Sequence, residues 1–426
     1  MKEKILRWLN VFGLQNPNVV FLAFVAAFFL DSAINYYFDF PLFVLFIMLT
    51  LPVLWLSLWL SDYKPVFLLL FVSMFGISVF INTLIYPFNN KNISDLVFIL
   101  LFATSFYYYH FFRKKLTLKA INIFLIAATI MIIPEFFKGK SIQNLQQEPQ
   151  TNNTVSHETT VPPAVITFDQ SNMLNSLEEP PKRISGIYRV PHIAAYFFGF
   201  LSLFYAFFYF RNKKWIYLAV SLLAATFVIL SGIRSIVFAM AMSFLLYLFI
   251  QRKMLVFLVS GGLVTLVLLF RFQLYFLLNK TFLKPYLALV VTLVDNSSRQ
   301  TRVMLWKSWF LEMKEFIWYH YLSGKTFFAS LLANKYNLHH KVWFHNDFLS
   351  VVYSYGLFCL VMYVGLWVII YRSYAKIIKR NVFIFVFYFA GVFAAFFNGY
   401  YYYFPVLLLF MFFLMINEEK KNLPTS

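Results

Sequence analysis

The sequence of 426 residues is 61% hydrophobic and only 12% charged, with a mean hydropathy of +0.71. This composition excludes an ordinary soluble globular domain and predicts an integral membrane protein. The net charge of +19 would indicate a nucleic-acid partner in a soluble protein. In a membrane protein, an excess of basic residues in the loops indicates which side of the membrane each loop occupies. The positive charge is explained in this way, so we expect no nucleic-acid partner.

Apolar runs of about 20 residues, long enough to cross a hydrocarbon core of roughly 30 Å, recur along nearly the whole chain. They predict an all-α integral membrane protein with about 12 transmembrane helices, because a helix satisfies its backbone hydrogen bonds inside the bilayer. The predicted spans are 18–38, 41–61, 65–86, 93–112, 117–137, 191–210, 214–231, 233–251, 254–273, 347–371, 381–398 and 401–417.

Two longer polar segments interrupt these spans and divide the chain into five parts. The first segment is rich in Gln, Asn, Thr and Pro, which is typical of a loosely folded loop. The parts are 1–137 with five spans, 138–190 as a first large periplasmic loop, 191–273 with four spans, 274–346 as a second large periplasmic loop, and 347–426 with three spans and a cytoplasmic tail.

The orientation follows from the basic residues of the short connections. Alternate connections carry Lys or Arg, and those between them carry almost none. By the positive-inside rule, both termini are cytoplasmic and both large loops are periplasmic, as in a multi-pass protein of the bacterial inner membrane. The cytoplasmic basic residues are Lys2, Lys4, Arg7, Lys64, Arg113, Lys114, Lys115, Lys119, Arg211, Lys213, Lys214, Arg252, Lys253, Arg372, Lys376, Lys379, Arg380, Lys420 and Lys421.

The second large loop contains a predicted amphipathic helix. Its apolar residues recur at helical spacing, with the charged residues elsewhere, so we expect it to lie at the membrane surface or over the mouth of a cavity. The apolar residues are Trp306, Trp309, Phe310, Met313, Phe316 and Ile317.

Five arginines lie on the predicted periplasmic side, against the positive-inside trend. They are Arg183, Arg189, Arg234, Arg299 and Arg302. An Arg on the periplasmic side beside apolar sequence is unfavourable unless an anionic group or water contacts its guanidinium. Contact with lipid headgroups explains each residue singly, whereas a shared anionic ligand explains the group. Guanidinium groups match phosphate oxygens and can hold a diphosphate without a metal.

The triplet His345-Asn346-Asp347 stands directly before an apolar run. An imidazole titrates near neutral pH, so His345 could take a proton from an attacking hydroxyl, with Asn346 or Asp347 orienting the ring or holding an acceptor. The alternative is that His345 and Asp347 cap the following helix.

Trp306 follows Arg299 and Arg302 at spacing that places all three on one helical face. Trp306 could stack on an acceptor sugar, and the alternative is a place in an interfacial aromatic belt.

The sequence predicts neither a metal nor a cofactor. The outer loops hold no Asp-rich pair suited to a divalent cation, and the spacing of His339, His340 and His345 fits no pair of ligands on a helix face. The segment 323–326 ends like a phosphate-binding loop but lacks the required upstream Gly. Cys359 is the only cysteine and lies in an apolar run, which indicates a structural role.

Four segments occur in a characteristic order: RISG at Arg183, SGIRS at Arg234, an SSRQTR…W loop, and HNDFLSVVYSYGLF with Gly356. Together they resemble the O-antigen polymerase and ligase superfamily of bacterial envelope glycosyltransferases, over roughly 183–370. The resemblance implies a GT-C-like, metal-independent enzyme that uses an undecaprenyl-diphosphate-linked glycan on the periplasmic face and inverts the anomeric carbon.

The resemblance also implies roles for the candidate residues. Arg183, Arg234 and Arg302 would hold the lipid diphosphate, with Arg189 and Arg299 as second choices, and His345 would activate or position the acceptor. The acceptor would be a second lipid-linked glycan for a polymerase, or lipid A–core for a ligase, and a chain-length regulator protein is a further implied partner. We expect a polymerase because of the two sizeable outer loops.

Outside the enzyme class, the same number of spans would suit a flippase or secondary transporter of lipid-linked glycans. Such proteins show ionisable residues near mid-membrane or broken helices. The predicted spans are poor in charge and the polar residues gather at one face, which favours the enzyme.

Overall fold

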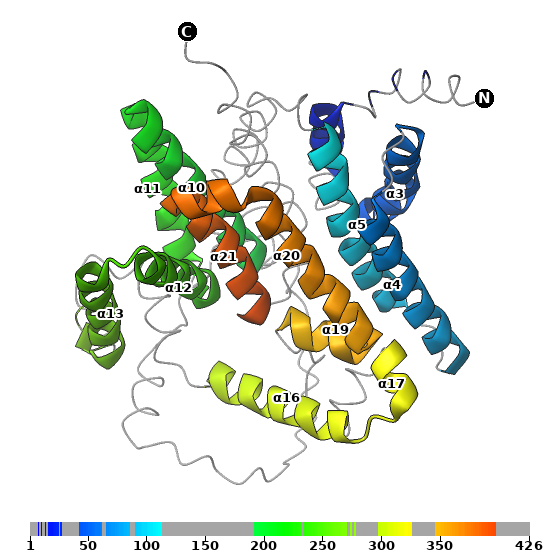
Figure 1. Cartoon of the computed structure of the whole chain (residues 1–426). Helices are drawn as coiled ribbons and strands as arrows, with labels where there is room; N and C mark the ends of the chain where they lie inside the picture. Colours follow the sequence, from blue (N-terminus) through cyan, green and yellow to red (C-terminus); the bar gives the residue numbers. More distant parts are fainter. Residues whose placement is uncertain are drawn as a thin grey trace, which may run out of the picture.

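The computed structural model describes residues 7, 10, 13, 16–24, 26, 27, 42–61, 65–85, 90–112, 191–231, 233–270, 273, 274, 277, 297–325 and 346–397. Within these ranges every regular element is a helix (Figure 1), which confirms the all-α prediction for this part of the chain. The predicted spans at 117–137 and 401–417, part of the span at 18–38 and the first large loop lie outside the described residues.

The helices follow the predicted apolar runs. Two of them, α4 and α20, are long and apolar enough to cross a membrane, and several others are apolar but shorter. The helices are α3 (Leu42–Leu60), α4 (Val66–Ile85), α5 (Asn90–Phe112), α10 (Pro191–Asn212), α11 (Trp215–Leu230), α12 (Arg234–Ile250), α13 (Met254–Leu269), α16 (Ser297–Lys314), α17 (Trp318–Ser323), α19 (Asp347–Tyr355), α20 (Leu357–Arg380) and α21 (Val382–Phe397).

Aromatic packing and a few small polar contacts hold the helices together. Helices α10 and α11 pack side by side, and α12 packs along α21. Ser202 Oγ of α10 donates to the Ser221 carbonyl of α11 at 3.0 Å, and Ser221 Oγ donates to the Ser202 carbonyl at 2.8 Å. Phe200 and Phe387 bring α10 and α21 together with a ring-centroid distance of 4.6 Å. Serine and aromatic contacts of this kind determine which helices pack together where apolar burial alone does not favour one helix pairing over another.

The predicted span 347–371 is wrong as a single helix. Gly356 separates α19 from α20 with φ 89° and ψ 174°, and α20 then continues to Arg380. The apolar pattern runs through the break because Gly356 is flanked by Tyr355 and Leu357. What ends α19 is a tertiary contact at Gly356, described below.

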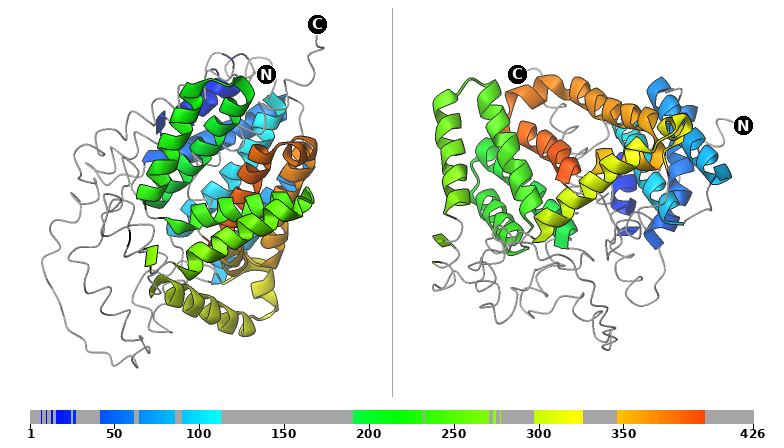
Figure 2. Two further views of the ribbon diagram at one scale, coloured as in Figure 1. Left: turned by 90° about the vertical axis from the view of Figure 1, so that its left-hand side faces the viewer. Right: turned by 90° about the horizontal axis from the view of Figure 1, so that it is seen from below.

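The predicted amphipathic helix also ends earlier than expected. Helix α16 stops at Lys314, so Phe316 and Ile317 lie in a short connection before α17. Phe316 is buried with Trp309 against α19, whereas Ile317 is exposed. Figures 1 and 2 show α16 lying across the lower end of the other helices, as expected for a helix that covers one end of a bundle.

Candidate functional site

The carboxyl ends of α17 and α19 meet back to back. Gly324 ends α17 with φ 74°, and Gly356 ends α19 with φ 89°. A Cβ on Gly324 would lie 2.6 Å from the Tyr355 amide nitrogen, and a Cβ on Gly356 would lie 2.6 Å from the Leu322 carbonyl oxygen. Each glycine therefore supplies both a backbone conformation that other residues rarely adopt and the space for the partner backbone.

Two polar side chains of α4 receive the helix ends. Ser78 Oγ is within hydrogen-bond distance of two carbonyl oxygens, that of Ser323 at 3.0 Å and that of Tyr355 at 2.8 Å. The Asn82 side-chain amide donates to the Ser323 and Ser78 carbonyls. The last carbonyls of a helix lack partners within it, so these two residues satisfy groups that would be unfavourable in an apolar layer.

This junction lies inside the apolar length of α4. Ser78 is seven residues before the end of α4 at Ile85, which corresponds to about 10 Å along the helix. The ends of the short helices α17 and α19 therefore lie alongside α4 and not beyond its end.

Helix α16 docks on the first turn of α19. Trp309 Nε1 donates to the Leu349 carbonyl at 3.1 Å, and Trp309, Phe316, Val352 and Tyr353 form one buried cluster. Leu349 lies four positions after His345 in the sequence. The structure thereby brings the helix that carries Arg299, Arg302 and Trp306 next to the segment that follows His345.

Asn346 and Asp347 have well-defined partners at the start of α19. The Asn346 side chain accepts a hydrogen bond from the Leu349 amide at 3.0 Å, so Asn346 is the N-cap of the helix. Asp347 is fully buried, and Tyr363 OH of α20 donates to its Oδ2 at 3.2 Å. A carboxylate in the first turn is favoured by the helix dipole, which helps to hold it in an apolar place.

A cluster of charged side chains joins the residue after α17 to α16. Lys325 Nζ lies 3.0 Å from Glu312 Oε2, which is buried, and 3.6 Å from Glu315 Oε2, which is half exposed. The Lys325 backbone amide donates to the Tyr353 carbonyl at 2.7 Å. These contacts give Gly324 and Lys325 a structural role, and they tie α16, α17 and α19 into one unit.

His320 of α17 belongs to the same unit and is 3% exposed. Its Nδ1 accepts a hydrogen bond from the Ile317 amide at 3.2 Å, so the proton of the neutral ring lies on Nε2. Burial, and then the charge of Lys325, lower the pKa of His320. His320 is therefore a neutral structural imidazole at pH 7.

The remaining predicted site residues divide into two groups. Arg299, Arg302 and Trp306 lie in α16, and Arg234 is the first residue of α12, a helix that packs on α10, α13 and α21. Arg183, Arg189 and His345 lie outside the described residues. Helical geometry places Arg299, Arg302 and Trp306 on one face of α16, as the spacing predicts.

Sequence reasoning missed several residues that shape this region, namely Ser78, Asn82, Glu312, His320 and Lys325. The pair Ser78 and Asn82 had a local signal, because polar residues four apart on an otherwise apolar helix share one face. The other three had none, since their partners are set by how α16, α17 and α19 fold together.

Chemically, the described part of this region offers a buried carboxylate, a neutral imidazole and an ion pair. No three His, Cys, Asp or Glu side chains within the described ranges are grouped as metal ligands. Comparison of the chain with family models, with curated proteins and with solved structures finds no match.

Proposed function

We propose that the chain is a membrane-embedded glycosyltransferase that polymerises undecaprenyl-diphosphate-linked O-antigen units at the periplasmic face. The observation that carries the proposal is the docking of α16 on the first turn of α19 through Trp309 and Leu349. This contact sets α16, which carries Arg299, Arg302 and Trp306, against the start of α19, the helix that follows His345 in the sequence. It supports a proposal in which a diphosphate-binding face on α16 and an acceptor-side base before α19 act together.

The surface of the helices supports the membrane placement. Large apolar side chains are exposed on many of them, and α13 is the extreme case, with Leu255 77% and Leu269 66% exposed. A soluble protein rarely exposes contiguous apolar surface of this extent, whereas lipid covers it without penalty. With about 12 spans in the bacterial inner membrane, both termini would be cytoplasmic and α16 would face the periplasm.

The proposed reaction needs no metal. A hydroxyl of the acceptor sugar attacks the anomeric carbon of the donor, and His345 takes the hydroxyl proton. The bond from the anomeric carbon to the diphosphate oxygen breaks, the configuration inverts, and undecaprenyl diphosphate leaves with the bonding electrons. Arg183, Arg234 and Arg302, with Arg189 and Arg299 beside them, stabilise the charge that grows on the diphosphate. Trp306 serves the acceptor side, and Asn346 and Asp347 orient the segment of His345 by fixing the start of α19.

The acceptor separates a polymerase from a ligase. For a polymerase the acceptor is a second lipid-linked glycan, and a chain-length regulator protein is a partner. For a ligase the acceptor is lipid A–core. The two activities share donor and chemistry, so the same residues serve either.

The test is lipopolysaccharide from a strain that lacks this gene, complemented with the unchanged chain, His345→Ala, Arg234→Ala or the control Lys307→Ala. Lys307 is exposed on α16 beside Trp306 and has no assigned role. We expect the deletion strain to carry single repeat units on its core, and His345→Ala and Arg234→Ala to restore no ladder at normal membrane levels of protein.

Three results contradict parts of the proposal. Bare core with accumulated lipid-linked polymer assigns the chain to ligation. A full ladder with His345→Ala returns that residue to a helix-cap role. An unchanged ladder in the deletion strain removes the chain from O-antigen assembly.

A second candidate is a transporter of lipid-linked glycans, and the break between α19 and α20 favours it. Helix ends at membrane depth and a buried ionisable residue such as Asp347 are features of secondary transporters. Transfer by the purified chain from a lipid-linked donor to a soluble acceptor glycan, in detergent, would exclude transport as the explanation. If no transfer occurs while vesicles containing the chain move the donor between leaflets, the transporter is the better assignment.

A further inference from the structure

The opposite end of α20 carries a pocket of about 680 Å³. Helix α20 has 24 residues, so its end at Arg380 lies roughly 36 Å from Gly356 and from the candidate site. Figure 1 shows the α20–α21 junction at the upper end of the molecule and α16 at the lower end. The pocket is therefore a separate place in the fold, on the side predicted to be cytoplasmic.

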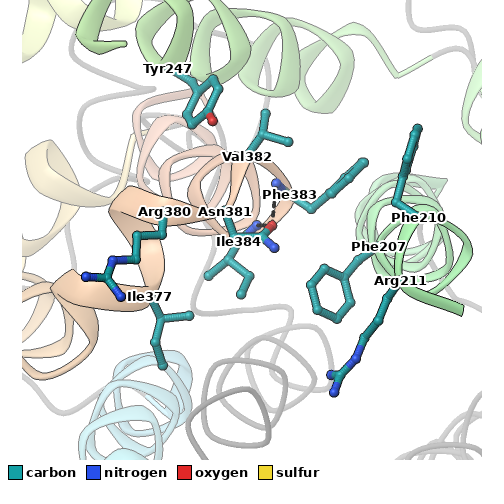
Figure 3. Close-up of a pocket in the computed structure, with 10 residues that line it drawn as sticks. All are labelled: Phe207, Phe210, Arg211, Tyr247, Ile377, Arg380, Asn381, Val382, Phe383 and Ile384. Carbon is teal, nitrogen blue, oxygen red and sulfur yellow. Dashed lines mark hydrogen bonds between the residues drawn. The ribbon is translucent and has the colours of Figure 1, made fainter. Parts of the chain in front are cut away.

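The pocket combines an apolar wall with two cationic groups. The apolar lining includes Phe207, Ile377 and Ile384, and the cations are Arg211 of α10 and Arg380 of α20. Figure 3 shows the two guanidinium groups at separate sides of the pocket, with these apolar side chains between them. The volume falls within the range of about 300–1,000 Å³ found for ligand pockets.

The two arginines are exposed, and no ion pair joins either of them to a carboxylate of the described ranges. The described lining residues contain no Asp or Glu. Asn381 Oδ1 accepts hydrogen bonds from the Phe383 amide at 3.0 Å and the Ile384 amide at 3.3 Å, so it caps the start of α21. Free donors for an anion at the pocket are therefore the guanidinium groups.

Further cations surround the pocket and raise the local positive potential. Gln251 Nε2 donates to the Lys379 carbonyl at 3.1 Å, so the turn after α12 lies against the end of α20. Beside Arg211 and Arg380, the exposed basic residues of these helix ends are Lys213, Lys214, Arg252, Lys253, Lys376 and Lys379. A basic pocket between helices at the cytoplasmic surface suits a lipid phosphate.

We propose that this pocket binds the headgroup phosphate of an anionic phospholipid of the cytoplasmic leaflet. The guanidinium groups of Arg211 and Arg380 are the donors offered to the phosphate oxygens, and Phe207, Ile377 and the exposed Phe210 contact the glycerol and the first acyl carbons. The lipid thereby links α10 to the α20–α21 junction. The inference rests on the membrane placement proposed above and is independent of the sugar-transfer chemistry.

The test is lipid retention by the purified full-length chain in a neutral detergent, measured by native mass spectrometry. The probes are dioleoylphosphatidylglycerol, zwitterionic dioleoylphosphatidylcholine and inorganic phosphate. The variants are Arg211→Gln and Arg380→Gln, with Arg372→Gln as the matched control, because Arg372 is exposed on the same helix and does not line the pocket. Thermal unfolding without added lipid verifies that all variants are folded.

We expect phosphatidylglycerol to bind more tightly than phosphatidylcholine, and each pocket variant to weaken its binding about fivefold while Arg372→Gln leaves it unchanged. An equal loss in all three variants would overturn the proposal, because it would show a diffuse surface-charge effect. Full competition by inorganic phosphate at millimolar concentration would identify a site for free phosphate and overturn the lipid assignment. The experiment measures lipid binding and not sugar transfer. Its result can therefore be interpreted even if the proposed enzyme activity proves wrong.

Discussion

At the residue scale, Gly324 and Gly356 decide how the ends of α17 and α19 meet. Each is required twice, once for its positive φ at the end of its own helix and once for the missing Cβ, whose place is taken by the backbone of the other helix end. Such reciprocal packing leaves no compensating movement, because the atoms that a Cβ would meet belong to backbone.

The first prediction follows from this contact. Gly356→Ala should lower the stability of the chain by about 2–4 kcal/mol, since it adds an unfavourable φ to an overlap with the Leu322 backbone. The measurement is thermal or denaturant unfolding in detergent. The matched control is Gly261→Ala in α13, where a Cβ would meet nothing within 4 Å and should be neutral or slightly stabilising. Equal stability of the two variants would contradict the reciprocal packing.

At the scale of elements, α17 depends on a neutral imidazole. At the start of this helix, Nδ1 of His320 accepts a hydrogen bond from the Ile317 amide. Protonation of that nitrogen would remove the acceptor. Burial and the nearby Lys325 both lower the pKa of His320 in the folded chain. The stability contribution is therefore complete above the ordinary histidine pKa of about 6.5 and is lost as pH falls toward the lowered pKa.

The second prediction concerns this pH dependence. His320→Asn retains an acceptor near the position of Nδ1 but cannot be protonated. Between pH 7 and pH 5, the unfolding temperature of the unchanged chain should fall more than that of His320→Asn. All other ionisable groups are the same in both proteins, so the difference between the two curves isolates His320. Parallel curves would show that this residue does not carry the effect.

Contacts with neighbouring segments hold α16 in place. Its Trp309 bonds to α19, its Glu312 pairs with Lys325, and Lys325 in turn bonds to the Tyr353 carbonyl. A surface helix held by one contact could move, whereas two contacts of different kinds, one of them to a lysine that is itself bonded to α19, fix both its position and its rotation. This fixed rotation is what a binding face with Arg299, Arg302 and Trp306 would need.

At the scale of the whole molecule, α20 separates two ends of different character. One end holds the polar junction of α17, α19 and α4, and the other holds exposed arginines and lysines around the pocket. A length of roughly 36 Å is close to the thickness of a bilayer core, so we expect these ends to face opposite sides of the membrane.

The third prediction tests this arrangement. Cys359 is the single cysteine and is buried, so Cys359→Ala gives a cysteine-free background. In that background, Lys307→Cys on α16 should react with a membrane-impermeant maleimide from outside spheroplasts. Lys214→Cys, at the turn before α11, should react only after the membrane is opened. Reaction of both from the same side would contradict the predicted topology.

The sequence by itself determined the class of secondary structure and the position of most described helices. Helices such as α4 and α11 lie within two residues of their predicted ends, because an apolar run of about 20 residues is a local signal. The sequence also predicted a helix through Arg299, Arg302 and Trp306, since spacing of three and four residues fixes a face without any partner.

Only the tertiary structure decided where α19 ends, why α16 stops at Lys314, and which groups surround the region after His345. Ser78 reaches the Ser323 carbonyl across 245 positions of sequence, and Gly356 is required by a backbone that precedes it by 34 positions. The pocket of Arg211 and Arg380 likewise needs four separate helices, α10, α12, α20 and α21. Such features depend on contacts between distant segments, and in an apolar chain those contacts are made by a few polar groups and glycines that no periodic pattern marks.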